Sequence, residues 1–311
     1  MRIAVLGAGA VGGYFGGRLA AAGRNVTFIV RPARKARLDA EGLAVESPAA
    51  GDLRVPVAAV TAAQVAAPFE VVLLSCKAYD LDDAIAAIRP AVGEGTVVVP
   101  LLNGLSHVER LQAAFGEAAV AGGLAKIAAT LEPDGTVRHL NDWQSITFGP
   151  LHPGQRPALE GLLEAFEGTG VTASLVEDIR SAMWEKLVHL ATVAGMTTLM
   201  RASVGEIART AAGASISLRL LAANAAIAAR EGHPVGEAAM EGYRAMFANP
   251  ASPYTASMLR DMERGGPVEA DHVIGHMQRL AVRHGMEADL YTVILTHLQA
   301  YEERRSAGRL R

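Results

Sequence analysis

The first thirty residues carry the feature that most constrains the fold. Residues 2–6 (RIAVL) are a short apolar run, residues 7–12 (GAGAVG) match the pattern G-x-G-x-x-G, and a segment of helix length follows. A strand, a glycine loop and a helix in this order are typical of a βαβ unit that binds a dinucleotide. The glycines give a tight turn, backbone approach to the pyrophosphate, and close packing of helix on strand, while the helix N-terminus attracts the anion. The alternative is a glycine-rich turn that binds nothing. The residues expected to contact the cofactor are Gly7, Gly9, Ala10, Val11 and Gly12.

The end of the second predicted strand indicates which dinucleotide is bound. A site for NAD places Asp or Glu about 20 residues after the glycines, on the ribose 2′-hydroxyl. Here residues 26–30 (VTFIV) run directly into Arg31, nineteen residues after Gly12. A guanidinium pairs with a 2′-phosphate through charge-assisted hydrogen bonds. We therefore predict NADPH rather than NADH, with Arg31 on the 2′-phosphate. The alternative is that Arg31, Arg34 and Lys35 are only a solvated helix start.

The first half of the chain alternates short apolar runs with stretches of helix length. The predicted strands are residues 2–6, 26–30, 71–75 and 96–100, and the predicted helices are residues 11–22, 80–89 and 158–167. Runs of this kind suit buried parallel strands, and their alternation with helices predicts a parallel sheet covered by helices. A turn signal (EPDG) separates residues 121–130 from 137–149, and we expect both flanks to be late strands of the same sheet. Residues 168–176 read as a loop and a last strand.

The pattern changes near residue 178, where long amphipathic stretches begin. They cover residues 179–200, 215–231 and 268–284, with glycine or proline between them. A chain of 311 residues holds about two domains at roughly 150 residues each. We therefore predict an α/β protein with an N-terminal Rossmann-type parallel-sheet domain, residues 1–176, which binds NADPH. An all-helical C-terminal domain, residues 177–311, would hold the substrate and the catalytic groups.

Composition excludes several classes of function. Lys and Arg number 29 against 32 Asp and Glu, and this near-balance argues against a nucleic-acid-binding protein. The longest uncharged stretches, such as residues 3–17, have 15 residues, whereas a membrane-spanning helix needs about 20. Glycines and Arg18 interrupt what could be a signal peptide, and the single cysteine, Cys76, suits a reducing compartment, so we expect a cytoplasmic protein. The nine histidines are scattered; His272 and His276 are four apart but lack an H-E-x-x-H motif, so no metal site is expected.

One lysine in the helical half has a position suited to acid catalysis. Lys186 lies at the edge of the apolar helical face formed by residues 184, 187, 188 and 191. A lysine beside a desolvated cleft has a lowered pKa and can act as a general acid, which the reduction of a ketone needs because hydride transfer leaves an alkoxide. The non-catalytic alternative is a lysine whose aliphatic stem packs against apolar neighbours while its ammonium group reaches water. Glu269, just after Pro267, and Ser257 are adequately explained as a first-turn carboxylate and a helix cap.

Two polar residues follow predicted strands of the sheet. Lys77 comes just after the third strand, and Asn103 with Gly104 comes just after the fourth. In an open α/β sheet, the loops beyond the carboxyl ends of the strands border the ligand crevice. Lys77 and Asn103 are therefore candidate site residues, against the alternatives of a surface lysine and an ordinary Asn-Gly turn.

Together, these segments resemble the ketopantoate reductases (2-dehydropantoate 2-reductases) over nearly the whole chain. The opening RIAVLGAGAVGGYFGGRLA is similar to the family's nucleotide loop, Cys76-Lys77-Ala78 to its C/V/T-K-A segment, and Leu102-Asn103-Gly104 to its Q-N-G. The WEKL around Lys186 resembles W-x-K-L. Residues 257–275, from SM to VEADHVIG, resemble S-S-M-x-x-D…T-E-I-D-x-I-x-G, and Glu269 comes twelve positions after Ser257. The lysine and serine–glutamate segments are far more specific than the glycine loop.

The resemblance implies a role for each matching residue. Lys186 would protonate the developing alkoxide, and Glu269 would bind the substrate hydroxyl or assist Lys186. Ser257 would hold the substrate carboxylate, while Lys77 and Asn103 would contact cofactor and substrate. The implied reaction is NADPH-dependent reduction of 2-dehydropantoate to pantoate, in pantothenate biosynthesis. A homodimer is a mild preference on general grounds.

The chain departs from the family where the substrate is recognised. The family has asparagines four and eight residues after the lysine, and this chain has Leu190 and Ala194. The first asparagine helps to bind substrate, and a site built to hydrogen-bond a hydroxyl loses a great deal without that partner. Two further substitutions are Leu102 for glutamine and Ala256 for serine. The residues that could compensate are His189, Thr192 and Tyr254. Reduction of a more apolar 2-keto acid, or an NADP(H)-binding regulatory role without turnover, stays open beside ketopantoate reduction.

Overall fold

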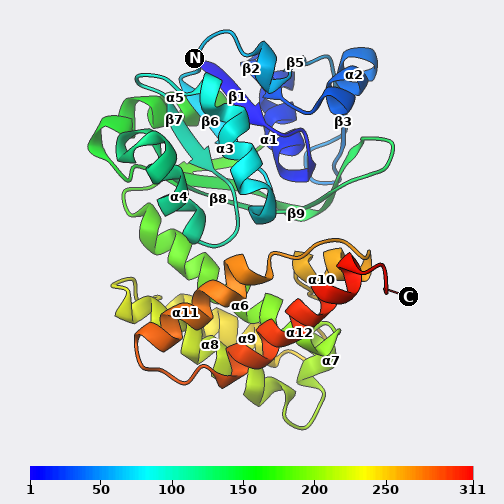
Figure 1. Ribbon diagram of the computed structural model, residues 1–311, viewed down its shortest axis with the longest axis vertical. Helices are drawn as coiled ribbons and strands as arrows, with labels where there is room; N and C mark the ends of the chain where they lie inside the picture. The colour runs from blue at the N-terminus through cyan, green and yellow to red at the C-terminus, as the bar shows by residue number, and fades with distance from the viewer. Residues whose placement is uncertain (311) are drawn as a thin grey trace. The chain divides into compact units, whose positions relative to one another are not determined.

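The computed structural model describes residues 1–310, and its chain divides into two compact units (Figure 1). The first unit contains Met1–Leu102 and His107–Ile179. The second contains the four residues Asn103–Ser106 together with the chain from Arg180 onward. All the strands lie in the first unit, and the second is built of helices. The predicted fold class, a parallel-sheet domain followed by a helical one, is confirmed.

The first sheet of the sheet-containing unit is entirely parallel. Its order is β5-β2-β1-β6-β7. The strands are β1 (Arg2–Leu6), β2 (Asn25–Ile29), β5 (Ala58–Val60), β6 (Val71–Leu74) and β7 (Val97–Pro100). The helices that follow these strands are α1 (Ala10–Ala21), α2 (Pro32–Glu41), α3 (Leu81–Ile88) and α4 (Ser106–Phe115). The four predicted strands are thus confirmed, and the burial of all of β6 and β7 explains their continuous apolar sequence.

The expectation that residues 121–130 and 137–149 extend this sheet is wrong. They form β8 (Gly122–Leu131) and β9 (Val137–Gly149), an antiparallel pair in a second five-stranded sheet, visible as the long green strands of Figure 1. The other members are β3 (Leu43–Glu46), β4 (Leu53–Val55) and β10 (Thr172–Leu175), in the order β10-β9-β3-β4. An isolated parallel β-bridge joins Val98 of β7 to Val120, just before β8, so the chain contacts the first sheet before it enters the second. The long strand β9 alternates buried and exposed residues over much of its length, as suits a sheet with one exposed face. This pattern differs from the continuous apolar runs of the parallel strands, and local sequence does not show which strands it pairs with.

Glycines in α1 allow this helix to contact both sheets. A Cβ on Gly16 would lie 2.6 Å from the ring of Phe28 in β2, and one on Gly17 would lie 3.0 Å from Leu43 in β3. Neither distance is normal for a real Cβ contact. The helix therefore packs between the sheets, and the apolar core of this unit includes side chains from both. α5 (Arg156–Phe166) completes the unit.

The second unit packs its helices around one apolar core. They are α6 (Ile179–Met200), α7 (Val204–Ala208), α8 (Gly213–Arg230), α9 (Glu237–Ala248), α10 (Ser257–Glu263), α11 (His276–Arg283) and α12 (Asp289–Ser306). A buried polar chain crosses this core. Asn224 donates a hydrogen bond to the Thr192 hydroxyl (2.9 Å), and the Tyr291 hydroxyl donates to Asn224 (2.7 Å). Within residues 1–310, no helix combines the length and hydropathy of a membrane span.

The stretch 268–284 is not the single regular helix that was predicted. A π-helical turn, Asp271–Gly275, precedes α11. A Cβ on Gly275 would lie 2.4 Å from a carboxylate oxygen of Asp271, so glycine is needed where the turn folds onto itself. Arg279 pairs with the same carboxylate at 2.7 Å. Glu269 therefore precedes this turn instead of lying in the first turn of a helix that starts at Pro267.

Candidate active site

The three glycines of the nucleotide loop have the geometry that the sequence pattern requires. Gly7 has φ +86°, a conformation that favours glycine, and its N–H donates to Ile29 of β2 at 2.9 Å. A Cβ on Gly12 would lie 2.3 Å from the carbonyl oxygen of Gly7. A Cβ on Gly9, in contrast, would meet nothing within 4 Å. The third glycine is thus needed for packing, while the space beside the second is open, as approach of a phosphate to the backbone requires.

The N-terminus of α1 supplies donors at this open position. The N–H of Gly13 donates to the carbonyl of Gly9 at 2.8 Å, and this hydrogen bond closes the first turn of the helix. The N–H groups of Ala10, Val11 and Gly12 precede that bond, and helical geometry gives them no partner within α1. Together with the helix dipole, they form a favourable place for an anion.

Three cations at the start of α2 have different surroundings. Arg31 is largely exposed and contacts Asp80 at 3.5 Å, with 78% of its side chain accessible. Arg34 is turned inward and donates to the carbonyls of Ala8 (2.9 Å) and Gly135 (3.0 Å), and burial lowers its pKa, with repulsion from Arg37 adding to the effect. Lys35 pairs with Asp39 at 2.6 Å.

Of these three, Arg31 has its guanidinium most accessible to a ligand, whereas Arg34 braces the glycine loop. Sequence reasoning missed this brace because Arg31 and Arg34 look alike at a helix start. Asp80, at the N-cap of α3, makes no capping hydrogen bond from its side chain and faces Arg31 instead.

Lys77 and Asn103 each follow a strand of the parallel sheet. Lys77 comes after β6, immediately before a short 3-10 turn (Ala78–Asp80), and is partly buried. Asn103 lies between β7 and α4 and belongs to the helical unit with the next three residues. Both residues therefore lie beyond the carboxyl ends of strands, as the sequence predicted.

The structure brings Lys186 and Glu269 together within the helical unit. Lys186 lies on α6 and is partly buried, and Glu269 is buried, with 8% of its surface exposed. Burial lowers the pKa of the Lys186 ammonium from 10.5 to about 8, while the Glu269 carboxylate acts in the opposite direction. The pair thus provides a proton donor whose pKa lies close to neutral pH, the property that a general acid needs.

Ser257 is the first residue of a helix anchored on the helix that carries Lys186. It opens α10 and is partly buried. The N–H of the preceding residue, Ala256, donates to the Thr197 hydroxyl of α6 at 3.4 Å. The two helices that hold Lys186 and Ser257 are thereby tied to each other.

The residues in place of the family's asparagines are packed as apolar side chains. Ala194 is fully buried in the helical core, and Leu190 packs against that core. Thr192 is also fully buried, and its hydroxyl donates to the Val188 carbonyl (2.8 Å) and accepts from Asn224. Of the three possible replacements for the asparagines, Thr192 is therefore fully engaged inside the core.

The other two possible replacements stack on each other. The His189 ring is stacked with Tyr254 at 5.7 Å and with Tyr243 at 5.0 Å between ring centroids. Burial raises the pKa of Tyr243 to about 12, and Glu185, which accepts a hydrogen bond from it, adds to the effect. The His189 ring of this aromatic group lies three residues after Lys186 on α6. The stacking needs tyrosines from distant segments, so no local pattern indicated it.

The two histidines spaced four apart have separate neighbours. His272 forms a hydrogen bond with Ser106. His276 lies near the Trp184 ring, 6.5 Å between centroids, and burial lowers its pKa to about 4. Among residues 1–310, no group of three or more His, Cys, Asp or Glu side chains is arranged to hold a metal ion.

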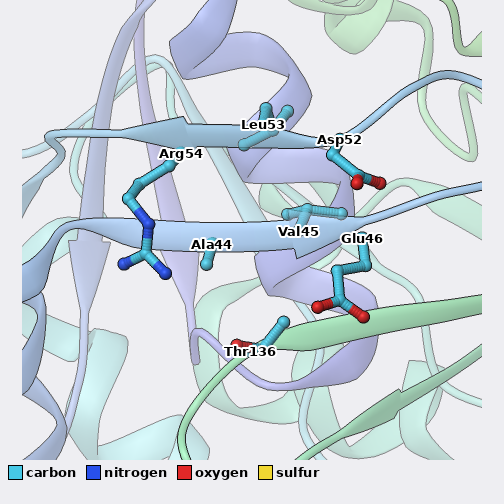
Figure 2. Close-up of a pocket in the computed structure, with 7 residues that line it drawn as sticks. All are labelled: Ala44, Val45, Glu46, Asp52, Leu53, Arg54 and Thr136. Carbon is cyan, nitrogen blue, oxygen red and sulfur yellow. The ribbon is translucent and has the colours of Figure 1, made fainter.

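A shallow pocket at the edge of the second sheet is separate from these residues. Its lining side chains include Glu46 of β3, Asp52 just before β4, Arg54 of β4, and Thr136 (Figure 2). None of its seven lining residues is a predicted cofactor-binding, substrate-binding or catalytic residue.

Comparison with known proteins identifies the family. The family model described as "Ketopantoate reductase PanE/ApbA" matches residues 3–153, and its C-terminal counterpart matches residues 178–302. The chain is 33% identical over 302 residues to the uncharacterized oxidoreductase YkpB of Bacillus subtilis, which covers 97% of this chain and 99% of YkpB. It is 28% identical over 305 residues to the 2-dehydropantoate 2-reductase of Pyrococcus horikoshii, over 97% of this chain and 98% of that enzyme.

Solved structures agree with this result. A PanE/ApbA family ketopantoate reductase from Ralstonia eutropha superimposes with a TM-score of 0.87 at 26% identity, over 98% of this chain and 100% of that one. A D-mandelate dehydrogenase bound to NADH and anilino(oxo)acetate has the same TM-score at 21% identity, over 98% and 100% of the two chains, and so shares the fold. The chain therefore belongs to the ketopantoate reductase family, whose members are NAD(P)H-binding oxidoreductases that act on CH–OH groups.

Proposed function

We propose that this protein uses NADPH to reduce a 2-keto acid to a 2-hydroxy acid, with Lys186 as the general acid. The observation that carries the proposal is the Lys186–Glu269 pair, in which burial brings the lysine pKa to about 8. NADPH supplies the hydride that reaches the carbonyl carbon. Lys186 donates a proton to the carbonyl oxygen, so that the product is a neutral hydroxyl and the lysine is left uncharged until it takes a proton from solvent.

Glu269 has two compatible tasks in this proposal. Its carboxylate raises the pKa of Lys186 against the effect of burial, and so keeps the lysine protonated before the reaction. It also accepts a hydrogen bond from a hydroxyl of the substrate. Ser257 and Asn103 bind the substrate, with Ser257 on its carboxylate, because carboxylate binding leaves the adjacent carbonyl to Lys186.

The cofactor is assigned to residues of the sheet-containing unit and to Asn103. Gly7, Gly9, Ala10, Val11 and Gly12 hold the pyrophosphate, because Gly9 leaves the necessary space and α1 presents its N-terminus there. Arg31 binds the 2′-phosphate, since its guanidinium is exposed and pairs only at 3.5 Å with Asp80. Lys77 and Asn103 contact the cofactor beyond the strand ends. Residues 1–176 are thus proposed as the NADPH-binding domain and residues 177–311 as the substrate domain.

The first substrate to consider is 2-dehydropantoate. Matches to curated 2-dehydropantoate 2-reductases over nearly the full chain support it, and it would place the protein in pantothenate biosynthesis. A second candidate is a more apolar 2-keto acid. The packing of Leu190 and Ala194 in the core and the commitment of Thr192 to Asn224 favour this candidate, because polar recognition of a substrate hydroxyl loses three possible partners.

The test is NADPH oxidation with 2-dehydropantoate beside a panel of 2-keto acids that have branched aliphatic or aromatic side chains. Efficient turnover of 2-dehydropantoate supports the first candidate, and turnover confined to apolar keto acids supports the second. NADPH binding without turnover of any member of the panel would contradict the enzymatic proposal and leave a regulatory role. The Lys186→Ala variant separates true turnover from a contaminating reductase, because only turnover by this protein depends on Lys186.

We also propose that the protein assembles as a homodimer. A ketopantoate reductase from Staphylococcus aureus, 20% identical in sequence, is described as dimeric. Light scattering coupled to size-exclusion chromatography would show a mass twice that of the 32.5 kDa chain if this protein dimerises as well.

A further inference from the structure

We propose that His272 is a positioning residue that holds the loop Asn103–Ser106 against the turn that follows Glu269. The inference rests on the proposed function only for the roles of Asn103 and Glu269. The contacts that support it do not depend on those roles.

His272 makes two contacts with this loop through one ring. Its Nδ1 lies 2.9 Å from the hydroxyl oxygen of Ser106. Gly104, at φ +82°, lies close against the ring, because a Cβ there would be 2.8 Å from Cδ2 and 2.9 Å from Nε2 of His272. The ring therefore fixes one residue of the loop by a hydrogen bond and another by close packing.

The membership of this loop in the helical unit is consistent with those contacts. Residues 103–105 lie in sequence between β7 and α4, and Ser106 is the first residue of α4. β7 and the rest of α4 belong to the sheet-containing unit. The four residues nevertheless cluster with the helices. Asn103 is adjacent to Gly104, so a shift of Gly104 would move Asn103 with it.

His272 is also linked along the backbone to Glu269, the proposed partner of the acid Lys186. It lies three residues after Glu269, and the N–H of the next residue, Val273, donates to the Glu269 carbonyl at 3.2 Å. The turn containing His272 is π-helical and is held by the Asp271–Arg279 pair. A continuous set of contacts therefore runs from Lys186 through Glu269 and His272 to the loop of Asn103. A π-helical turn is often found at functional sites because it changes the direction of a side chain within a helix.

Such a link has a function in hydride transfer. The proton donor and the groups that align substrate and cofactor must hold their geometry together, and a misplacement of about 1 Å costs up to 10²-fold in rate. His272 would keep the distance between Asn103 and the Lys186–Glu269 pair constant without contacting substrate or cofactor itself. A residue that only packed the fold would change stability and leave kinetic parameters alone.

The test compares three variants and a matched control. His272→Phe keeps a ring over Gly104 and loses the hydrogen bond, Ser106→Ala loses the same bond from the other side, and His272→Asn places an amide near the Nδ1 position. Ser181→Ala is the control, because it removes another serine–histidine bond of 2.9 Å, to His233, in the same unit. The readouts are kcat and KM with the best keto acid, and hydrogen–deuterium exchange of the peptide that contains residues 103–106.

The proposal predicts that His272→Phe and Ser106→Ala lower kcat/KM by about tenfold each, the value of one hydrogen bond of ordinary strength. The double variant should be no worse than either single variant, since both remove one interaction. Exchange in the loop should be faster in both, His272→Asn should recover most of the loss, and Ser181→Ala should behave as wild type.

Two results would overturn the proposal: wild-type loop exchange in His272→Phe and Ser106→Ala, or equal kinetic loss in Ser181→Ala. If the wild-type protein turns over no keto acid, the proposed function fails, and loop exchange still decides whether His272 holds the loop.

Discussion

Two opposing influences act on the Lys186 side chain. Burial favours the neutral amine, and the Glu269 carboxylate favours the ammonium, with burial the larger effect. The resulting pKa of about 8 lets the lysine be protonated at neutral pH and still release its proton readily. The apolar helical face around residue 186 indicated the burial, but not the carboxylate, which is 83 residues away along the chain.

Replacement of Lys186 tests its role as the acid. Lys186→Ala should lower kcat by about 10²-fold or more, the usual contribution of a general acid. Lys186→Arg is the control, because it keeps the positive charge but does not release a proton near neutral pH. Steady-state kinetics should show both variants impaired. Recovery in the arginine variant would indicate that charge alone matters, and proton transfer would be excluded.

The pH profile should report the same group. Since the acid is active when protonated, kcat/KM should fall as pH rises through about 8. In Glu269→Gln the carboxylate no longer raises the lysine pKa, so the fall should occur at lower pH. Glu241→Gln, an exposed position on α9, should keep the wild-type profile. An unchanged profile in Glu269→Gln would show that the titrating group is not Lys186 paired with Glu269.

The proposed function makes Arg31 the side chain that decides between NADPH and NADH. Arg31→Ala should raise the KM for NADPH by roughly tenfold or more, as loss of a charge-assisted contact does, and leave the KM for NADH unchanged. Arg54→Ala, which removes an equal charge at the pocket of Figure 2, controls for net charge. Equal weakening of both cofactors would contradict assignment of Arg31 to the 2′-phosphate.

At the scale of elements, α1 shows how one helix can require glycine for two reasons. Glycine at the start of the helix leaves the backbone open to a ligand, and glycine in its middle lets the helix pack closely against β2 and β3. The sequence pattern reveals the first need because the motif is local. The second was not visible, since it depends on a sheet formed by residues far along the chain.

Alanine substitutions in two helices should have opposite effects on stability. Gly16→Ala should destabilise the protein by about 1–3 kcal/mol, because its Cβ would overlap the Phe28 ring. Gly242→Ala in the middle of α9 meets nothing within 4 Å and should stabilise it by about 0.5–1 kcal/mol through helix propensity. Thermal or urea unfolding measures both. Stabilisation by Gly16→Ala would show that α1 does not pack closely on β2.

At the scale of the whole molecule, the sequence predicted what depends on local periodicity. Four strands of the parallel sheet, the glycine loop and α6 were located within a few residues, whereas the short edge strand β5 was not predicted. The second sheet was missed because its short strands β3 and β4 have little apolar signal, and because strand pairing between distant segments leaves no local pattern.

The candidate site followed the same rule. Motifs selected Lys186 and Glu269, and the structure brings these two together. The brace by Arg34, the enclosure of Thr192 and the π-helical turn before α11 depend on tertiary partners, so no local pattern indicated them.

The assignment of Asn103–Ser106 to the helical unit has a consequence for biosynthesis. The chain passes between the units after Leu102, after Ser106 and after Ile179, so neither unit is a continuous segment. The ribosome makes this loop more than 160 residues before it makes His272, its hydrogen-bonding partner. A fragment that ends at Ile179 would carry the loop without that partner, and a fragment that starts at Arg180 would lack the loop entirely. During synthesis the contact between this loop and His272 can therefore form only after His272 has been made, and neither fragment can form it alone.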